Sequence, residues 1–129
     1  MRHLFFPILW TIIIGILTGL PGNSFPNMSL WALLSFDSFA HCFVFAVFTF
    51  LWSVALCKQT RRPLLRHRGH YIAAGIGIIY GFLIEILQYM VYVGRSAEWA
   101  DIIADTLGCI AGWALFTIIY GPILRAINR

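Results

Sequence analysis

The chain has 129 residues, of which 60% are hydrophobic and only 11% are charged, with a mean hydropathy of +0.84 and a formal net charge of +4. A soluble domain needs more charge than this to cover its surface. The composition therefore excludes an ordinary water-soluble enzyme or binding domain, and it indicates a single integral membrane domain over residues 1–129.

Four apolar runs set the expected architecture. Each is close to or above the ~20 residues that a helix needs to cross a hydrocarbon layer of roughly 30 Å. None shows the alternation typical of barrel strands, and only helices and closed barrels satisfy their backbone in lipid. We therefore expect an all-α polytopic membrane protein with four transmembrane helices in an antiparallel bundle. The expected helices cover residues 4–20, 38–57, 71–93 and 99–124.

The first run, residues 4–20, carries no charge and is expected to be a packing helix. Arg2 before an apolar core also fits a secretory signal peptide, but the residues that follow make a poor cleavage site, so we favour a retained helix. Further along, Ser29 is expected to cap a short separate helix over residues 30–36. Its aromatic residues favour an anchor at the membrane interface, with a lid as the alternative.

Positive charge is concentrated at the two ends of the chain and in the loop between the second and third runs. By the positive-inside rule, both termini and this loop lie in the cytoplasm. We expect the loop to set the topology, not to bind nucleic acid. The residues concerned are Arg2; Lys58, Arg61, Arg62, Arg66 and Arg68; and Arg125 and Arg129.

The three cysteines, Cys42, Cys57 and Cys109, fall within or at the ends of apolar runs, and no two of them form a C-x-x-C pair. This pattern favours packing roles and predicts no disulfide framework. We expect no cofactor and no metal, because no motif has the spacing of a known ligand set. A metal held by the acidic residues and the histidine described below is the less favoured variant.

Small residues recur every four positions along the third run, at Ala73, Gly77 and Gly81. Such a stripe allows two membrane helices to pack closely. Glu85 is the next step along this stripe, and Gln88 follows one turn later. We therefore expect Glu85 to face the bundle, not the lipid.

The fourth run repeats this arrangement. Asp101, Asp105, Gly108 and Gly112 share one helix face at spacings of four, three and four residues. Gly108 and Gly112 form a G-x-x-x-G stripe, which is typical of close helix packing. The short turn over residues 94–98 predicts that the third and fourth helices are antiparallel neighbours.

The polar residues of the expected helices lie towards one end of the bundle. Asp37 and His41 share a face at the start of the second helix. Counted from the outer ends, Glu85 lies roughly 12 Å and Asp105 roughly 9 Å deep. All acidic residues, His41 and the only outside arginine, Arg95, therefore map to the outer half, and the inner half offers no polar path.

This clustering constrains the chemistry. Two like charges about 4 Å apart repel by ~4 kcal/mol at an effective dielectric constant of 20. Glu85, Asp101 and Asp105 therefore require protonation, a counter-charge or a bound cation. Ionisable residues within membrane helices are a functional-site hypothesis by default. The expected substrate-binding residues are Asp37, His41, Glu85, Gln88, Arg95, Asp101 and Asp105, and the candidates for catalytic acid or base are His41, Glu85, Asp101 and Asp105.

Three segments, "FDSFAHCFVFAVF", "GFLIEILQ" and "GRSAEWADIIADTLGCIAG", together resemble the VanZ-like family of small bacterial membrane proteins. The family pattern resembles D-x-x-x-H, then G-x-x-x-E-x-x-Q, then an arginine in a short turn, then D-x-x-x-N-x-x-G-x-x-x-G. Those positions fall here on Asp37 and His41; Gly81, Glu85 and Gln88; Arg95; and Asp101, Gly108 and Gly112.

Two departures from the pattern stand out. Ser38 occupies a position where family members often have lysine, and Asp105 replaces the usual asparagine, which adds a negative charge and removes an amide donor. The resemblance implies a bacterial inner (plasma) membrane protein with a link to the cell envelope. The founding member is an accessory of glycopeptide resistance associated with teicoplanin tolerance.

Three kinds of function stay open on the sequence. The favoured one is a site open to the outer leaflet that binds or acts on a membrane lipid or a lipid-linked envelope precursor, with Arg95 suited to hold an anionic headgroup. The alternatives are proton or cation handling, and a non-catalytic scaffold whose polar cluster only fixes helix packing. Whether a reaction is catalysed stays open, and a homo-oligomer is a further expectation.

Overall fold

The computed structural model describes residues 2–19, 30–59, 62–91 and 99–127, and these residues are all-helical apart from a few at segment ends. The all-α prediction is therefore confirmed. In chain order the elements are the 3-10 turn η1 (Arg2–Leu4), α1 (Phe5–Thr18), α2 (Leu30–Cys57), α3 (Pro63–Val91), α4 (Trp99–Leu115), the π-helical turn η3 (Phe116–Tyr120) and α5 (Gly121–Ile127).

Three of these helical stretches are long and apolar enough to cross a membrane. They are Asp37–Cys57 within α2, Pro63–Val91, which is α3, and Trp99–Ile123, which runs from α4 into α5. The fourth apolar helix, α1, has only 14 residues. The predicted membrane character thus holds for three of the four expected spans.

The structure corrects the predicted start of the second helix. The sequence was expected to form a separate short helix over residues 30–36, but α2 runs without a break from Leu30 to Cys57. No glycine or proline lies between these two residues, so nothing in the chain interrupts the backbone hydrogen bonds. Ser29, the predicted cap, lies outside the described residues.

The structure also moves the start of the third helix into the basic loop. The predicted start was residue 71, but α3 begins at Pro63. Proline is favoured at the first helical position, because its missing N–H would have no partner there and its fixed φ suits the helix. Arginine is a good helix former, so Arg66 and Arg68 continue the helix beyond the apolar run. The apolar run therefore predicted only part of this helix, which begins eight residues earlier, at Pro63.

The last helical stretch was predicted as one helix over residues 99–124 and is interrupted by the wider turn η3. In this turn the N–H of Gly121 donates to the carbonyl of Phe116, five residues earlier. Pro122 follows directly and cannot fit a regular α-helix, because it lacks an N–H and its ring crowds the carbonyl four residues before it. The wider turn accommodates the proline while the chain stays helical.

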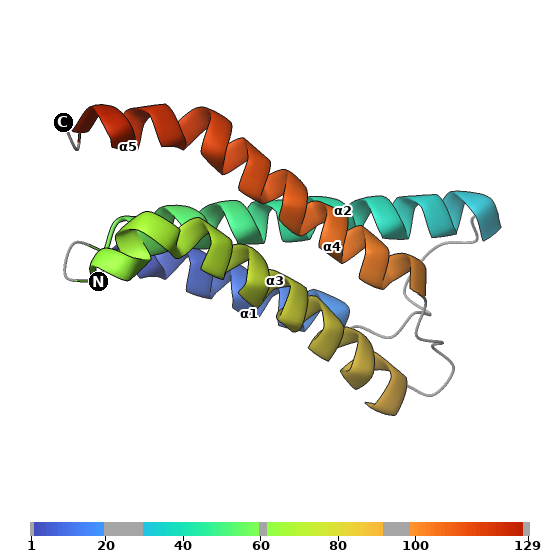
Figure 1. The fold of residues 1–129 in the computed structure, drawn as a ribbon. Helices are drawn as coiled ribbons and strands as arrows, with labels where there is room; N and C mark the ends of the chain where they lie inside the picture. The colour runs from blue at the N-terminus through green and yellow to red at the C-terminus, as the bar shows by residue number, and fades with distance from the viewer. Residues whose placement is uncertain (1, 20–29, 60–61, 92–98, 128–129) are drawn as a thin grey trace.

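Helix α2 lies at the centre of the molecule and packs against α1, α3 and α4. Figure 1 shows α4 crossing α2, while α1 lies beside α3. The apolar core joins α1, α2, α3 and α4. It consists of Ile14 from α1, Phe45 and Phe48 from α2, Ile84 from α3 and Cys109 from α4.

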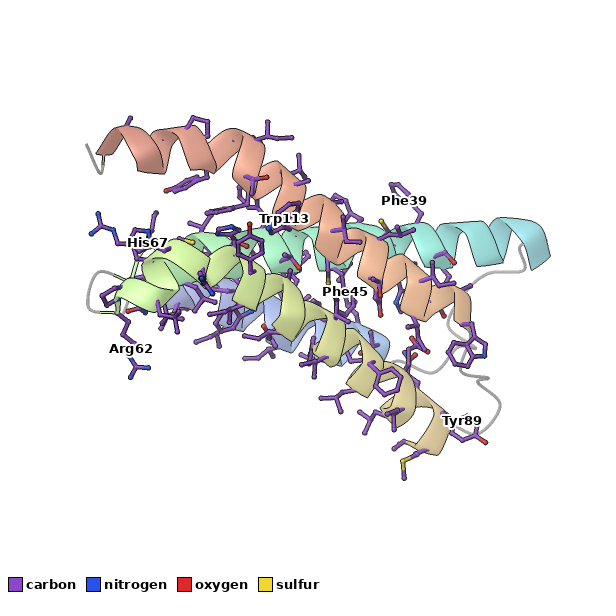
Figure 2. The ribbon with its side chains drawn as sticks, viewed as in Figure 1. Phe39, Phe45, Arg62, His67, Tyr89 and Trp113 are labelled. Carbon is purple, nitrogen blue, oxygen red and sulfur yellow. The ribbon has the colours of Figure 1, made fainter. Side chains whose placement is uncertain are left out.

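The outer faces of the helices are also apolar. Figure 2 shows Phe45 between the helices, whereas Phe39 and Tyr89 point away from the bundle. Phe39 is 68% exposed and Tyr89 is 69% exposed, although both side chains are largely apolar. A surface of this kind is suited to contact with lipid tails. Lipid tails are as apolar as these side chains, so the hydrophobic effect does not drive the side chains into the bundle.

Glycines bring α4 against the backbone of α2. A Cβ atom added at Gly108 would overlap the carbonyl of Cys42, and one added at Gly112 would overlap the carbonyl of Ala46. The two glycines lie one turn apart, so the two helices touch over a full turn. This contact fixes the distance between α2 and α4 next to His41.

Hydrogen bonds to backbone carbonyls attach α1 to the other helices. Tyr80 on α3 donates from its hydroxyl to the carbonyl of Thr11 at 3.0 Å, and Trp10 donates from Nε1 to the carbonyl of Val44 at 3.1 Å. Such bonds matter within an apolar layer because lipid tails offer no replacement partner.

We expect Tyr80→Phe to lower the free energy of unfolding by about 1 kcal/mol, the typical net contribution of one hydrogen bond. Denaturant unfolding of the purified protein in detergent measures this. Tyr89→Phe, at the exposed end of α3, is the matched control and should leave stability unchanged. Equal losses for the two variants would contradict the attachment of α1 through Tyr80.

Candidate functional site

The centre of the candidate site is a buried pair between α2 and α4. Nδ1 of His41 lies 2.9 Å from Oδ1 of Asp105, within hydrogen-bond distance. His41 is 8% exposed and Asp105 is 2% exposed. The close contact of Gly108 with Cys42 explains the pairing, because Cys42 follows His41 and Gly108 lies one turn after Asp105. The predicted small-residue stripe on α4 thus places Asp105 against His41 on α2.

Glu85 of α3 joins this pair. It is 2% exposed, and one ligand atom from each of His41, Glu85 and Asp105 lies within 4.8 Å of the other two. A Cβ atom at Gly81 would lie 2.8 Å from Oδ2 of Asp105. The absence of a side chain at Gly81, one turn before Glu85, therefore makes the room in which the Asp105 carboxylate lies against α3.

One oxygen of this cluster stands out. Oδ2 of Asp105 is buried and accepts no hydrogen bond from any part of the chain that the structure describes. Buried carboxylate oxygens are normally satisfied, because an unsatisfied charged or polar atom carries its full desolvation cost. The space next to this oxygen is therefore the natural position for a proton, a water molecule or a cation.

Asp37 and Asp101 form the outer edge of the cluster. With His41 they make a second group whose ligand atoms lie within 4.8 Å of one another. Nε2 of His41 lies 3.9 Å from Oδ1 of Asp37, whose side chain is 38% exposed, while Asp101 is 8% exposed. The two ring nitrogens of His41 therefore face two different carboxylates, a buried one and one that reaches the surface.

Gln88, about one turn after Glu85, lines a groove between α1 and α3. It is 4% exposed, and its Nε2 donates to the carbonyl of Thr18 at 3.0 Å. This groove has a volume of about 350 Å³, and its other walls are mostly apolar. Among the lining residues are Gly15, Thr18, Tyr80, Leu83, Leu87 and Gln88.

The structure thus brings together five of the predicted site residues, Asp37, His41, Glu85, Asp101 and Asp105. Gln88 is buried about one turn after Glu85 on α3 and lines the groove. Arg95, the predicted anion-binding residue, lies outside the described residues. Sequence reasoning missed the groove and the contact of Gly81 with Asp105. The spacing of Gly81, Glu85 and Gln88 indicated that this face of α3 is closely packed. Spacing along one helix does not, however, predict which residue of a neighbouring helix contacts that face.

The arrangement offers two kinds of chemistry. A histidine bonded to a carboxylate can hold or move a proton, which is the function of a general acid or base. An imidazole nitrogen next to carboxylate oxygens is also a ligand set for a divalent cation.

Comparison with known families identifies the fold family. The family model described as VanZ/LLP1 matches residues 4–120. The chain belongs to the VanZ/LLP1 family. The match confirms the resemblance to the VanZ-like family that the three motif segments indicated. The matched range includes every candidate site residue of this VanZ/LLP1 protein. Together with the three long apolar helices, the family indicates a membrane protein. No curated protein and no solved structure matches the chain.

Proposed function

We propose that this VanZ/LLP1 protein binds the headgroup of a membrane lipid or of a lipid-linked envelope precursor at the outer leaflet of the bacterial inner membrane. One observation carries the proposal. Helix α3 contributes to both a buried polar cluster and an apolar groove: Glu85 belongs to the cluster with His41 and Asp105, and Gln88, about one turn later, lines the groove. A lipid needs this combination, because its headgroup requires polar partners while its chain prefers an apolar surface.

The proposed topology has four antiparallel spans and two cytoplasmic termini. Helix α1 alone is about 21 Å long at 1.5 Å per residue, so its span includes residues on either side of it. Figure 1 shows both ends of the chain at the same end of the molecule. Arg62 and His67, at the start of α3, lie at that end as well (Figure 2). Basic residues favour the cytoplasmic side, which leaves the acidic cluster in the outer half.

Within this proposal each part has a separate role. The groove between α1 and α3 holds the apolar chain of the ligand. Asp37, with a partly exposed side chain, lies where a headgroup would enter. His41 and Asp105 then contact the headgroup or exchange a proton with it. The link to teicoplanin tolerance is the corresponding phenotype, because glycopeptides act on envelope precursors outside the cell.

Co-purified lipid, measured by mass spectrometry, tests the proposal. We expect His41→Ala and Glu85→Gln to lower the amount of bound lipid about tenfold, which corresponds to ~1.4 kcal/mol of binding free energy. Gly15→Phe should lower it as well by filling the groove, since Gly15 lines the groove and its Cβ position has only an ordinary contact, 3.4 Å from the hydroxyl of Tyr80.

Gly75→Phe is the matched control, because nothing lies within 4 Å of the Cβ position at Gly75 and this residue does not line the groove. Unchanged lipid content in all three site variants would overturn the proposal. If Glu85→Gln then lowered only the thermal stability, the cluster would be a packing device. Proton or cation flux into liposomes above that of empty vesicles would instead support the ion-handling alternative.

A further inference from the structure

The buried cluster between α2, α3 and α4 has the composition of a metal site. We propose that His41, Glu85 and Asp105 bind one divalent transition-metal cation, with Mn²⁺ and Zn²⁺ as the best-suited ions. This inference goes beyond headgroup binding, because the ligands belong to the protein alone and the cation would be held without any lipid.

The distances fit such an ion. One ligand atom from each of the three residues lies within 4.8 Å of the others, and Nδ1 of His41 lies 2.9 Å from Oδ1 of Asp105. Two neighbouring ligands on one ion, each at 2.0–2.2 Å from it, are about 3.0 Å apart in an octahedral site and about 3.4 Å apart in a tetrahedral one. His41 and Asp105 lie close to this spacing, and the ligand atom of Glu85 is within 4.8 Å of both.

An independent observation points to a missing partner. Oδ2 of Asp105 is buried, has no hydrogen bond to the residues that the structure describes, and faces α3 next to Gly81. Glu85 follows Gly81 by one turn on the same face of α3. The unsatisfied oxygen therefore points to the side of the cluster from which the third ligand comes.

The second nitrogen of His41 also has a suitable neighbour. If Nδ1 binds the metal, the proton of the imidazole lies on Nε2, which faces Oδ1 of Asp37 across 3.9 Å. Metal-binding histidines commonly present their other N–H to a carboxylate, which fixes the ring and increases its basicity. Asp37 is thus a positioning residue for His41 and not a ligand.

Charge supports a cation at this position. Glu85 and Asp105 are both buried carboxylates, and one oxygen of each lies within 4.8 Å of the other. A divalent ion would offset the repulsion between the two buried carboxylates. Imidazole favours Zn²⁺ and related ions, whereas carboxylates also suit Mn²⁺, so this mixed set selects against Ca²⁺ and Mg²⁺.

The test uses the full-length protein in detergent, stripped with a chelator and then titrated with MnCl₂ or ZnCl₂. We expect one equivalent of metal per chain after desalting, measured by elemental mass spectrometry, and a higher melting temperature in its presence. Glu85→Gln should weaken binding at least about tenfold, a loss typical of altered metal sites. Asp105→Asn should do the same, which keeps the test valid if one variant does not fold.

Asp101→Asn is the matched control, since Asp101 is also a buried carboxylate but belongs to the outer group with Asp37. It should keep one equivalent of metal. Absence of stoichiometric metal in the wild type, or equal binding in Glu85→Gln, would overturn the proposal. So would loss of metal in Asp101→Asn with retention in Glu85→Gln, which would place the ion in the outer group. Because no lipid is added, lipid binding can fail independently of this result.

Discussion

Gly108→Ala is expected to lower the free energy of unfolding by about 3 kcal/mol, the upper part of the range for overpacked sites. The added methyl group would overlap the carbonyl of Cys42, which is backbone and cannot rotate away. Helices α2 and α4 would have to separate, and the contacts of a full turn would loosen. Denaturant unfolding in detergent measures the loss, and size-exclusion chromatography reports whether the variant stays monodisperse.

Gly75→Ala is the control for this prediction. Gly75 also lies inside a helix, but nothing is found within 4 Å of its Cβ position. Alanine there should be neutral or stabilising by up to about 1 kcal/mol, because glycine is the poorer helix former. A Gly108→Ala protein as stable as Gly75→Ala would show that α2 and α4 are not in backbone contact.

The second large effect concerns the buried pair. We expect His41→Leu and Asp105→Leu, each made singly, to lower the free energy of unfolding by about 3 kcal/mol, because each leaves a buried polar partner without its hydrogen bond. The double variant should be more stable than either single one, since an apolar pair carries no desolvation cost. A chelator in the buffer removes any contribution from bound metal.

A double-mutant cycle decides this prediction. The two single losses should not add, and the coupling between neighbouring, directly bonded residues should lie in the range of about 0.5–3 kcal/mol. Phe39→Leu, on the outward face of α2, is a control that should leave stability unchanged. Strictly additive losses for His41 and Asp105 would mean that the 2.9 Å contact contributes nothing to the fold.

Metal and lipid binding at one cluster would be linked. A divalent ion held by His41, Glu85 and Asp105 can polarise a phosphoryl or carbonyl oxygen of a headgroup. The apolar groove lined by Gln88 would hold the chain of the same molecule. The two proposals can be separated experimentally, because Gly15→Phe changes only the groove whereas Glu85→Gln changes the ligand set.

Several features followed from the sequence because they depend on local spacing or composition. The apolar runs predicted three helical stretches, in α2, in α3 and from α4 into α5, that are long and apolar enough to cross a membrane, since crossing the hydrocarbon layer requires a minimum apolar length. The stripe of Gly77, Gly81 and Glu85 predicted a protein-facing side, and these three residues are buried. The motif order also predicted the VanZ-like family, which the family comparison confirmed.

Helix ends were predicted less well. The start of α2 at Leu30 and of α3 at Pro63 lies outside the apolar runs, because a helix continues wherever no residue breaks its hydrogen bonds. The π-helical turn before Pro122 was also missed, since it is a local adjustment that lets a proline remain within a helical stretch.

What the sequence determined by itself is that this chain forms apolar helices, that two of them carry acidic residues on their small-residue faces, and that a third carries Asp37 and His41 on one face. Only the tertiary structure decided that His41 pairs with Asp105, that Gly81 lies against the same carboxylate, and that a groove opens between α1 and α3. The reason is physical: spacing along a helix fixes which residues share a face, whereas the partner of that face depends on how the helices cross and how closely their backbones approach.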